Sequence, residues 1–433
     1  MMFPIRRLLV FSLLLGLPSI ARALEAEPPN DLAASLSTLG RKPDWSELEK
    51  YQSTMTHDEF LHLLKDVYAP HGWSPDLIEV TPTEARITKH KAAPEIFTLH
   101  FAKTDADRLP LDHTWTSPAK LPPVADAGPL AGLHIALDPG HLGGAWAKIE
   151  ERWYQIKKAP PIQEGDMTLK VAKLLAPRLE SLGAKVSLVR AEAEPTTPYR
   201  PSDFREIALQ ILHRNGVADP PDDFSGPADP EKEKSVRWQE ELLFYRTSEI
   251  RRRAGQVNYR IQPDLVLCLH FNAEPWGDPA SPTLVKKNHL HLLVNGAYLP
   301  AEIDLDDERC EMLHKLLSQA YPEELGLAEA ISLTMAKKTA LPPYQYTTPD
   351  NVTPVGKSGY VYARNLMATR LYRCPTVYLE PYVMNSREVF ARVEAGDYEG
   401  TKHVGGKRRP SIFREYVDGV VDGVVAYFKH ARP

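Results

Sequence analysis

Two histidines and one carboxylate stand directly after apolar stretches of the sequence. The run 135–137 leads into Asp138-Pro139-Gly140-His141, the run 264–269 ends at His270, and the run 377–379 ends at Glu380. Short apolar runs of this kind predict buried strands. The active site of an open α/β sheet lies at the carboxyl ends of its strands. Two imidazoles and one acid delivered to that edge indicate a metal site with a catalytic base.

This set of residue types suits metal-assisted hydrolysis. Two histidines and a carboxylate are a common ligand set for catalytic zinc, and they leave one coordination position for water. The metal makes that water a nucleophile near neutral pH and polarises an amide carbonyl. A further carboxylate that is not a ligand can take the proton of the water and pass it to the leaving nitrogen. The sequence holds no G-x-S-x-G elbow and no context for a cysteine nucleophile.

The elements that must position these residues alternate between strand and helix from Gly132 onward. A strand at 134–137, a periodic helix at 168–182 closed by Gly183 and a strand at 185–189 come first. A long helix is expected at 238–259, before the His270 strand. Further strands at 289–294 and 376–379 and helices at 325–339 and 411–429 follow. This order predicts an α/β fold with a mostly parallel twisted sheet flanked by helices on both faces.

At 433 residues the chain is too long for one ordinary core. We expect a small α+β module of unknown role at 24–117, a Pro/Gly-rich linker at 118–130 and a catalytic domain at 131–433. The role of the module is open between wall anchoring, partner recruitment and structural support. Insertions are expected near 191–235 and 296–365, and the sequence does not decide whether they form a lid or an autoinhibitory element.

The first residues have the pattern of an export signal. Arg6 and Arg7 precede an apolar run, and Ala21-Arg22-Ala23 is an A-x-A cleavage site. We expect residues 1–23 to be removed, with an uncleaved membrane anchor as the alternative, and a periplasmic or extracellular location without a transmembrane segment. Cleavage removes three arginines and shifts the formal net charge from −5 to −8, which argues against nucleic-acid binding.

The three cysteines form no disulfide framework. Cys268 and Cys374 both lie on expected core strands, so one pair and one free thiol, Cys310, is an open alternative. Buried unpaired thiols are the favoured interpretation.

Four sequence blocks, in their order, give the chain from about Leu130 onward a resemblance to a known family. The first block is D-P-G-H at 138–141. The second, at 164–190, begins with an acid that opens a helix and ends with the pattern L-x-x-x-G-x-x-V-x-x-x-R. The third is H-x-N-A at 270–273, and the fourth is P-x-V-x-x-E followed by N-S at 375–386. The chain resembles the zinc-dependent N-acetylmuramoyl-L-alanine amidases, the family 3 cell-wall amidases. The resemblance covers roughly 300 residues and leaves 24–129 outside.

The resemblance implies a role for each of four residues. His141, Glu164 and His270 would be the ligands of Zn²⁺, and Glu380 would be the general base. Glu164 lies 23 residues after His141, a longer interval than is usual in the family, and Glu150 and Glu151 come earlier in the same loop.

The same residues also have non-catalytic interpretations. His141 could be a turn histidine, His270 a satisfied imidazole at a strand end, and Glu380 a structural acid that pairs with Arg373. Asp166 is expected to favour the helix dipole rather than a metal.

Several other charged residues have ordinary explanations. His289 and His291 alternate on one strand without a third ligand nearby, so we interpret them as strand residues. The acidic run 304–308 lacks the turn glycine of a calcium loop and is expected to be a solvated loop. Arg251, Arg252 and Arg253 are expected to divide between solvent and ion pairs.

The resemblance implies hydrolysis of the amide bond between N-acetylmuramic acid and L-alanine, with peptidoglycan or muropeptides as partners. A zinc peptidase or amidase that acts on another peptide amide is an alternative, and so is a non-catalytic wall-binding protein with a decayed site. All four residues of the proposed site are present, which argues against decay. Whether a protein activator is needed is left open.

Overall fold

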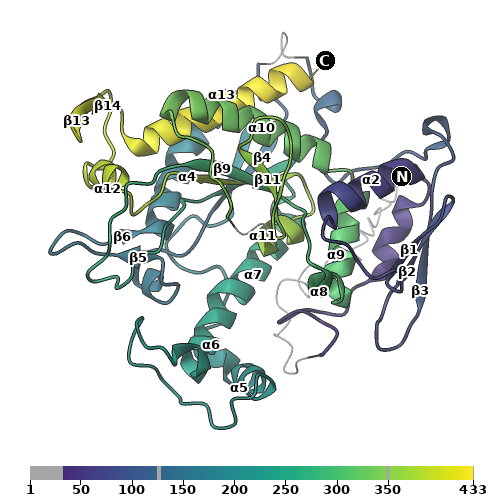
Figure 1. Cartoon of the computed structure of the whole chain (residues 1–433). Coiled ribbons are helices and arrows are strands. Elements are labelled where there is room, and N and C mark those ends of the chain that lie inside the picture. Colours follow the sequence, from purple (N-terminus) through teal and green to yellow (C-terminus); the bar gives the residue numbers. More distant parts are fainter. Residues whose placement is uncertain (1–32, 124–127, 348–350, 433) are drawn as a thin grey trace, which may run out of the picture.

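A seven-stranded sheet forms the centre of the molecule (Figure 1). The computed structural model describes residues 33–123, 128–347 and 351–432, so the signal sequence expected at 1–23 lies outside the described residues. The strand order is β10-β11-β9-β12-β8-β4-β7. The strands are β4 (His134–Pro139), β7 (Lys185–Leu188), β8 (Leu265–Leu269), β9 (Leu290–Val294), β10 (Thr353–Pro354), β11 (Val361–Ala363) and β12 (Thr376–Pro381).

Four of the six strand pairings in this sheet are parallel. They join β7 to β4, β4 to β8, β8 to β12 and β9 to β11. The pairings of β9 with β12 and of β10 with β11 are antiparallel. The expectation of a mostly parallel α/β sheet is therefore confirmed, with antiparallel pairings on the side of β9 and β10.

Helices cover both faces of the sheet because its central strands are apolar on both sides. Ile135 and Leu137 of β4 join one core cluster, whereas Ala136 between them joins another on the opposite face. The first face is covered by α4, α10 and α13, and the second by α7 and α11. These helices are α4 (Glu164–Glu180), α7 (Glu249–Gln256), α10 (Tyr321–Thr339), α11 (Met367–Leu371) and α13 (Ile412–Ala431).

The long helix expected at 238–259 is present as one helical stretch from Val236 to Ile261. It comprises α6 (Val236–Leu242), a π-helical segment (Leu243–Ser248), α7 and a second π-helical segment (Val257–Ile261). The excursion before it contains α5 (Arg205–Arg214), which packs on α6. This part of the chain also contains the hairpins β5 (Trp153–Tyr154) with β6 (Ile162–Gln163) and β13 (Lys402–Val404) with β14 (Lys407–Arg409), and helix α12 (Arg387–Glu394).

The N-terminal part of the chain forms a three-stranded antiparallel sheet and a short helix. The elements are α2 (His57–Leu63), β1 (Ile78–Val80), β2 (Glu84–Thr88) and β3 (Ile96–His100). They lie beside α8 (Pro300–Ile303) and α9 (Asp306–Leu317) (Figure 1). The buried Arg309 of α9 donates to the carbonyl oxygen of Thr88 at 3.0 Å, so hydrogen bonds as well as apolar packing join this sheet to α9.

The expectation of a solvated acidic loop at 304–308 is wrong. Asp306, Asp307 and Glu308 begin α9 and are buried. Each carboxylate has a partner within the protein: Arg309 donates to Asp306 at 2.7 Å, Ser37 N to Asp307 at 2.8 Å and Arg370 to Glu308 at 2.9 Å. These partners lie up to 270 residues away in the sequence, which local pattern does not reveal.

The two ends of the part of the chain that contains the large sheet are in contact with each other. Arg432, which follows α13, donates to the carbonyl oxygens of Gly128 at 2.9 Å and Pro129 at 3.0 Å. Among the helices of the described residues, none combines the length and the apolar character needed to cross a bilayer.

Candidate metal centre

The strand register brings the ends of three strands to one edge of the sheet. Leu269 of β8 pairs with Pro139 of β4 on one side and with Leu379 of β12 on the other. His270 and Glu380 each come next in the chain after this paired position, and His141 follows Pro139 by two. Three residues separated by more than a hundred positions therefore meet at the carboxyl ends of parallel strands.

His141, Glu164 and His270 form a cluster of potential metal ligands. One ligand atom from each lies within 4.8 Å of the others. Glu164 joins the two rings: its Oε1 is 3.2 Å from His270 Nδ1 and its Oε2 is 3.5 Å from His141 Nε2. Glu164 and His270 are buried, and His141 is partly exposed, so the cluster is reachable from solvent on the His141 side.

The residue types of the cluster suit a tetrahedral zinc ion. The two histidine contacts of Glu164 use different carboxylate oxygens, Oε1 toward His270 and Oε2 toward His141. Two imidazoles and one carboxylate also leave the fourth position to water or substrate, as in catalytic sites.

The turn that presents His141 is shaped by backbone strain and by a glycine. His141 has a φ of 56°, in the left-handed region that non-glycine residues seldom occupy. A Cβ at Gly140 would overlap the ring of His270. The Gly140-His141 pair thus lets the backbone of one ligand pass directly against the ring of the other.

Glu164 reaches the cluster because helix α4 begins at this residue, four positions before the expected start at Thr168. A Cβ on Gly165 would overlap the backbone of Leu142, so the first turn of α4 packs directly against the turn that follows His141. Glu164 Oε1 also accepts a hydrogen bond from Phe271 N at 3.1 Å. Asp166 instead accepts from Gly144 N at 3.1 Å and contributes no atom to the cluster.

Glu150 holds the ring of His141 from the other side. Its Oε2 lies 3.0 Å from His141 Nδ1 and accepts from Leu142 N at 2.9 Å. The contact leaves Nε2 directed at Glu164. Metal-binding histidines commonly use such a carboxylate to fix the ring orientation and tautomer. The sequence placed Glu150 only in the loop, and its sole signal was a position nine residues after His141.

A buried arginine on α7 fixes the strand end before His141. Arg253 donates to Asp138 at 3.0 Å and to the carbonyl oxygens of Pro139 and His141 at 2.9 and 3.3 Å. Glu249 accepts from Arg253 Nε at 2.7 Å and balances its charge. Asp138 also accepts from Tyr372 at 2.6 Å, so the aspartate of D-P-G-H is a structural residue. No sequence pattern points to this network.

Glu380 lies in an environment that suits a proton acceptor. Its Oε2 is enclosed and has no hydrogen-bond partner among the described residues. Burial and the neighbouring charge of Glu164 raise its pKa to about 8, against the attraction of Arg152 and Arg364. Pairing with Arg373 is not observed, because Arg373 contacts Glu47 at 2.5 Å instead. No sequence pattern points to Arg152 or Arg364.

The two buried members of the cluster differ in charge: Glu164 is charged and His270 is neutral. Burial raises the pKa of Glu164, but the attraction of His141, His270 and Arg152 outweighs it and lowers the pKa to about 2. Burial lowers the pKa of His270 to about 4. A charged carboxylate and a neutral imidazole are the forms that bind a metal ion, and His270 is further fixed by stacking on Tyr378 at 4.0 Å between ring centroids.

The other histidines of the neighbouring strand lie outside this cluster, as do the cysteines. His291 pairs across the sheet with Glu380, but its ring atoms contact Tyr346 at 3.1 Å and Asn272 at 3.4 Å. His289 lies 3.6 Å from Glu274. All three cysteines are free and buried, as favoured.

Among the comparisons with known proteins, similarity is found to solved structures, several of which are amidases. No protein-family model matches the chain, and no curated protein is detectably similar to it. The N-acetylmuramyl-L-alanine amidase Ami1 from Mycobacterium smegmatis is 14% identical, with a TM-score of 0.36 over 70% of this chain and 99% of that chain. The apo form of Ami1 from Mycobacterium abscessus is 17% identical, with a TM-score of 0.37 over 69% of this chain and 99% of that chain.

A third solved structure that is similar to this chain contains a second protein. It is the CwlD amidase from Clostridioides difficile in complex with the GerS lipoprotein. It is 12% identical, with a TM-score of 0.36 over 68% of this chain and 98% of that chain. Because the sequence identities and TM-scores are this low, the chemistry of the present chain rests on its own residues.

Proposed function

We propose that this chain is an exported zinc amidase that hydrolyses the bond between N-acetylmuramic acid and L-alanine in peptidoglycan. The single observation that carries the proposal is the His141, Glu164 and His270 cluster beside Glu380. The four sequence blocks that resemble the family 3 cell-wall amidases support the choice of substrate. Export rests on the signal pattern at 1–23.

Each residue of the site has a role in this proposal. His141, Glu164 and His270 hold the metal, and Glu150 orients His141. Bound zinc supplies an activated water and polarises the amide carbonyl. Glu380 accepts the proton of the attacking water and transfers it to the leaving nitrogen of L-alanine. Its enclosed Oε2 suits this task because no group of the described residues donates a hydrogen bond to it.

The arginine network has a positioning role in the same proposal. Arg253 binds three acceptors around the turn before His141, so it keeps the strained His141 backbone in place. Strain of this kind persists only where surrounding contacts over-determine the backbone. The positively charged Arg152 balances Glu164 and Glu380.

Digestion of purified muropeptides followed by mass spectrometry tests the function. We expect the zinc-loaded protein to release intact stem peptides and leave glycan with free lactyl groups. Cleavage inside the stem peptide would assign a zinc peptidase instead. No cleavage of muropeptides or of intact sacculi by a zinc-loaded, folded protein would favour a wall-binding role.

A further inference from the structure

Arg152 stands beside two acids of the metal site, and the backbone of a hairpin holds it there. It directly precedes β5, in which Trp153 pairs with Gln163 of β6. The next position along the hairpin places Arg152 opposite Glu164, and the N–H of Glu164 donates to the carbonyl oxygen of Arg152 at 3.1 Å. Side chains of directly opposed residues in an antiparallel pair lie on the same face. The hairpin therefore directs Arg152 to the same side as the proposed metal ligand Glu164.

This hairpin is anchored to the rest of the site. The hydroxyl of the buried Tyr154 donates to the carbonyl oxygen of Met384, which follows β12, at 2.6 Å. The N–H of Gln155 donates to the carbonyl oxygen of Pro279 at 2.8 Å. Catalytic groups act best when neighbouring contacts fix their position. The backbone of Arg152 is fixed in this way.

The acids that act on Arg152 are the two acids of the metal site. Burial lowers the pKa of the Arg152 guanidinium, but the charges of Glu164 and Glu380 outweigh burial and raise the pKa. Among the described residues, the guanidinium nevertheless forms no hydrogen bond with either carboxylate. A guanidinium carries several N–H donors and binds oxyanions well. Arg152 therefore keeps donors available beside the proposed base and the metal ligands.

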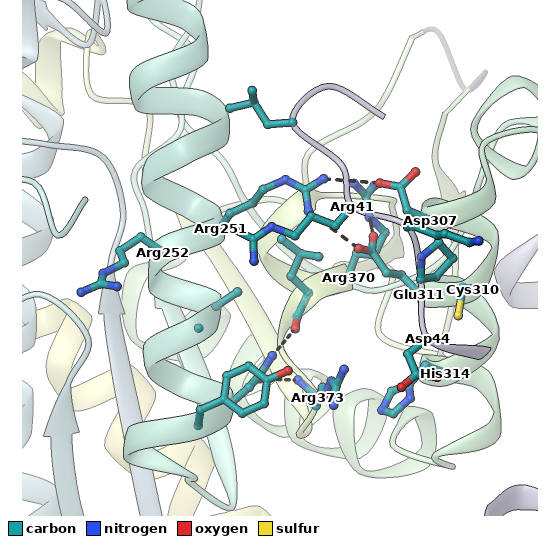
Figure 2. A pocket seen from close by; sticks show the side chains of 18 of the residues that line it. Arg41, Asp44, Arg251, Arg252, Asp307, Cys310, Glu311, His314, Arg370 and Arg373 are labelled. Carbon is teal, nitrogen blue, oxygen red and sulfur yellow. Dashed lines mark hydrogen bonds and ion pairs between the residues drawn. The ribbon is translucent and has the colours of Figure 1, made fainter. Parts of the chain in front are cut away.

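A cavity of about 350 Å³ beside α7 shows the opposite use of arginine (Figure 2). In its wall, Arg370 donates to Glu311 at 2.7 Å. Arg373, in the same wall, donates to Glu47 at 2.5 Å. Protein carboxylates occupy these guanidinium groups, so they serve the structure of the wall. In the described part of the chain, Arg152 has no such partner.

Hydrolysis of an amide creates the negative charge that such donors can bind. When the oxygen of the attacking water bonds to the amide carbon, one electron pair of the C=O bond moves onto the carbonyl oxygen. The C–N bond then breaks, and the nitrogen takes the proton that Glu380 received from the water. Between these two events the former carbonyl oxygen is an oxyanion. A donor aimed at this oxyanion accelerates turnover by about 100- to 1,000-fold.

We propose that Arg152 is a catalytic residue that donates a hydrogen bond to the oxyanion of the tetrahedral intermediate. This inference rests on the proposed amide hydrolysis and adds to it a fifth residue of the site, beside His141, Glu164, His270 and Glu380. It also gives the long interval between His141 and Glu164 a role, because the β5–β6 hairpin lies within that interval.

Turnover of an N-acetylmuramoyl dipeptide that begins with L-alanine tests the proposal. The zinc content of each protein is measured first, so that loss of metal is not mistaken for loss of the contact. For Arg152→Gln we expect kcat to fall by about 100-fold and KM to change by less than about threefold, because the donor acts on the intermediate and not on bound substrate. Wild-type kcat in this variant, or a rise in KM alone, would overturn the proposal.

Two further variants separate catalysis from structure. Arg152→Lys keeps the charge and should restore at least about tenfold of the turnover lost in Arg152→Gln. Arg178→Gln removes a half-exposed arginine of α4 that pairs with Asp418, and it should keep wild-type turnover. If Arg152→Gln does not hold zinc, a comparison of Arg152→Lys with the wild type decides, and equal kcat in the two would contradict a specific guanidinium contact.

Binding of acetohydroxamate distinguishes failure of this inference from failure of the proposed function. This small amide analogue offers two oxygens to zinc and needs neither the sugar nor the peptide. In calorimetric titration of the zinc-loaded mature chain, Arg152→Gln should bind it at least about tenfold more weakly than the wild type, whereas Arg178→Gln should not differ. Such a loss in a protein that cleaves no muramoyl peptide would refute the proposed substrate and support the role of Arg152. Equal binding and equal cleavage by wild type and Arg152→Gln would refute that role and leave the amidase function intact.

Discussion

Glu150 Oε2 lies 3.0 Å from Nδ1 of His141 and accepts a second hydrogen bond from Leu142 N at 2.9 Å. One buried carboxylate thus fixes both the ring and the following backbone of a proposed metal ligand. We expect Glu150→Gln to lower zinc affinity by about 10- to 100-fold, as removal of such partners commonly does. Competition with a chromophoric chelator measures the affinity. Glu151→Gln, at the neighbouring residue that pairs with Lys232, is the control and should bind zinc as the wild type does.

Replacement of the proposed base separates catalysis from metal binding. Glu380→Gln keeps the size of the side chain but cannot accept the proton, so we expect turnover to fall by at least about 100-fold. Zinc content, measured by mass spectrometry of the purified protein, should stay at the wild-type level. The exposed Glu394→Gln should keep its activity. Wild-type turnover in Glu380→Gln would refute the assignment.

The close approach of Gly140 to His270 makes a methyl group disruptive. Gly140→Ala would place a Cβ in the His270 ring, and overpacking of this kind costs about 1–3 kcal/mol of unfolding free energy. We expect the variant to lose zinc as well, because His270 must move. Gly396→Ala is the control: its φ is 70° but its Cβ would meet open space, so it should lose stability and keep zinc. Equal zinc content in the two variants would contradict the prediction.

A partly buried acid on α10 predicts a pH dependence of stability. Burial and the charges of Glu324 and Asp264 raise the pKa of Glu323 to about 7. The unfolded chain loses this proton near a pH of about 4.3, so between these values only the native state holds it. This contribution to stability is present below about pH 4.3 and is lost as the pH rises through 7.

Glu323→Gln should remove that loss. From pH 5 to pH 8 we expect the unfolding free energy of the wild type to fall by on the order of 2 kcal/mol more than that of the variant. Urea unfolding at the two pH values measures the difference. Glu180→Gln, at an exposed position of α4, should follow the wild type. Parallel pH profiles for wild type and Glu323→Gln would show that Glu323 does not keep its proton.

The strand ends were predictable because each carries its own local signal. The apolar runs before Gly140, His270 and Glu380 marked buried strands, and burial on both faces marked a parallel sheet. The direction of β9 was not predictable. An apolar strand has no local feature that distinguishes parallel from antiparallel pairing, so its antiparallel contact with β12 is known only from the structure.

The start of α4 shows why Glu164 was difficult to place. Asp166 and Thr168 are both good residues near a helix N-terminus, so capping preferences favoured a start at 168. Tertiary packing instead extends the helix to Glu164, because Gly165 allows contact with Leu142. The roles of Glu150 and Arg253 depend on contacts between loops and helices far apart in the sequence, which no local pattern encodes.

The contact of Arg432 with Gly128 and Pro129 has a consequence for protein engineering. Because the two ends of the large α/β part touch, a short peptide could join them without crossing the molecule. New ends could then be opened in a surface loop, such as the exposed turn at Gly405 and Gly406 between β13 and β14. Such a circular permutant keeps all strand pairings of the sheet while it changes the place in the chain where the N-terminal part is attached.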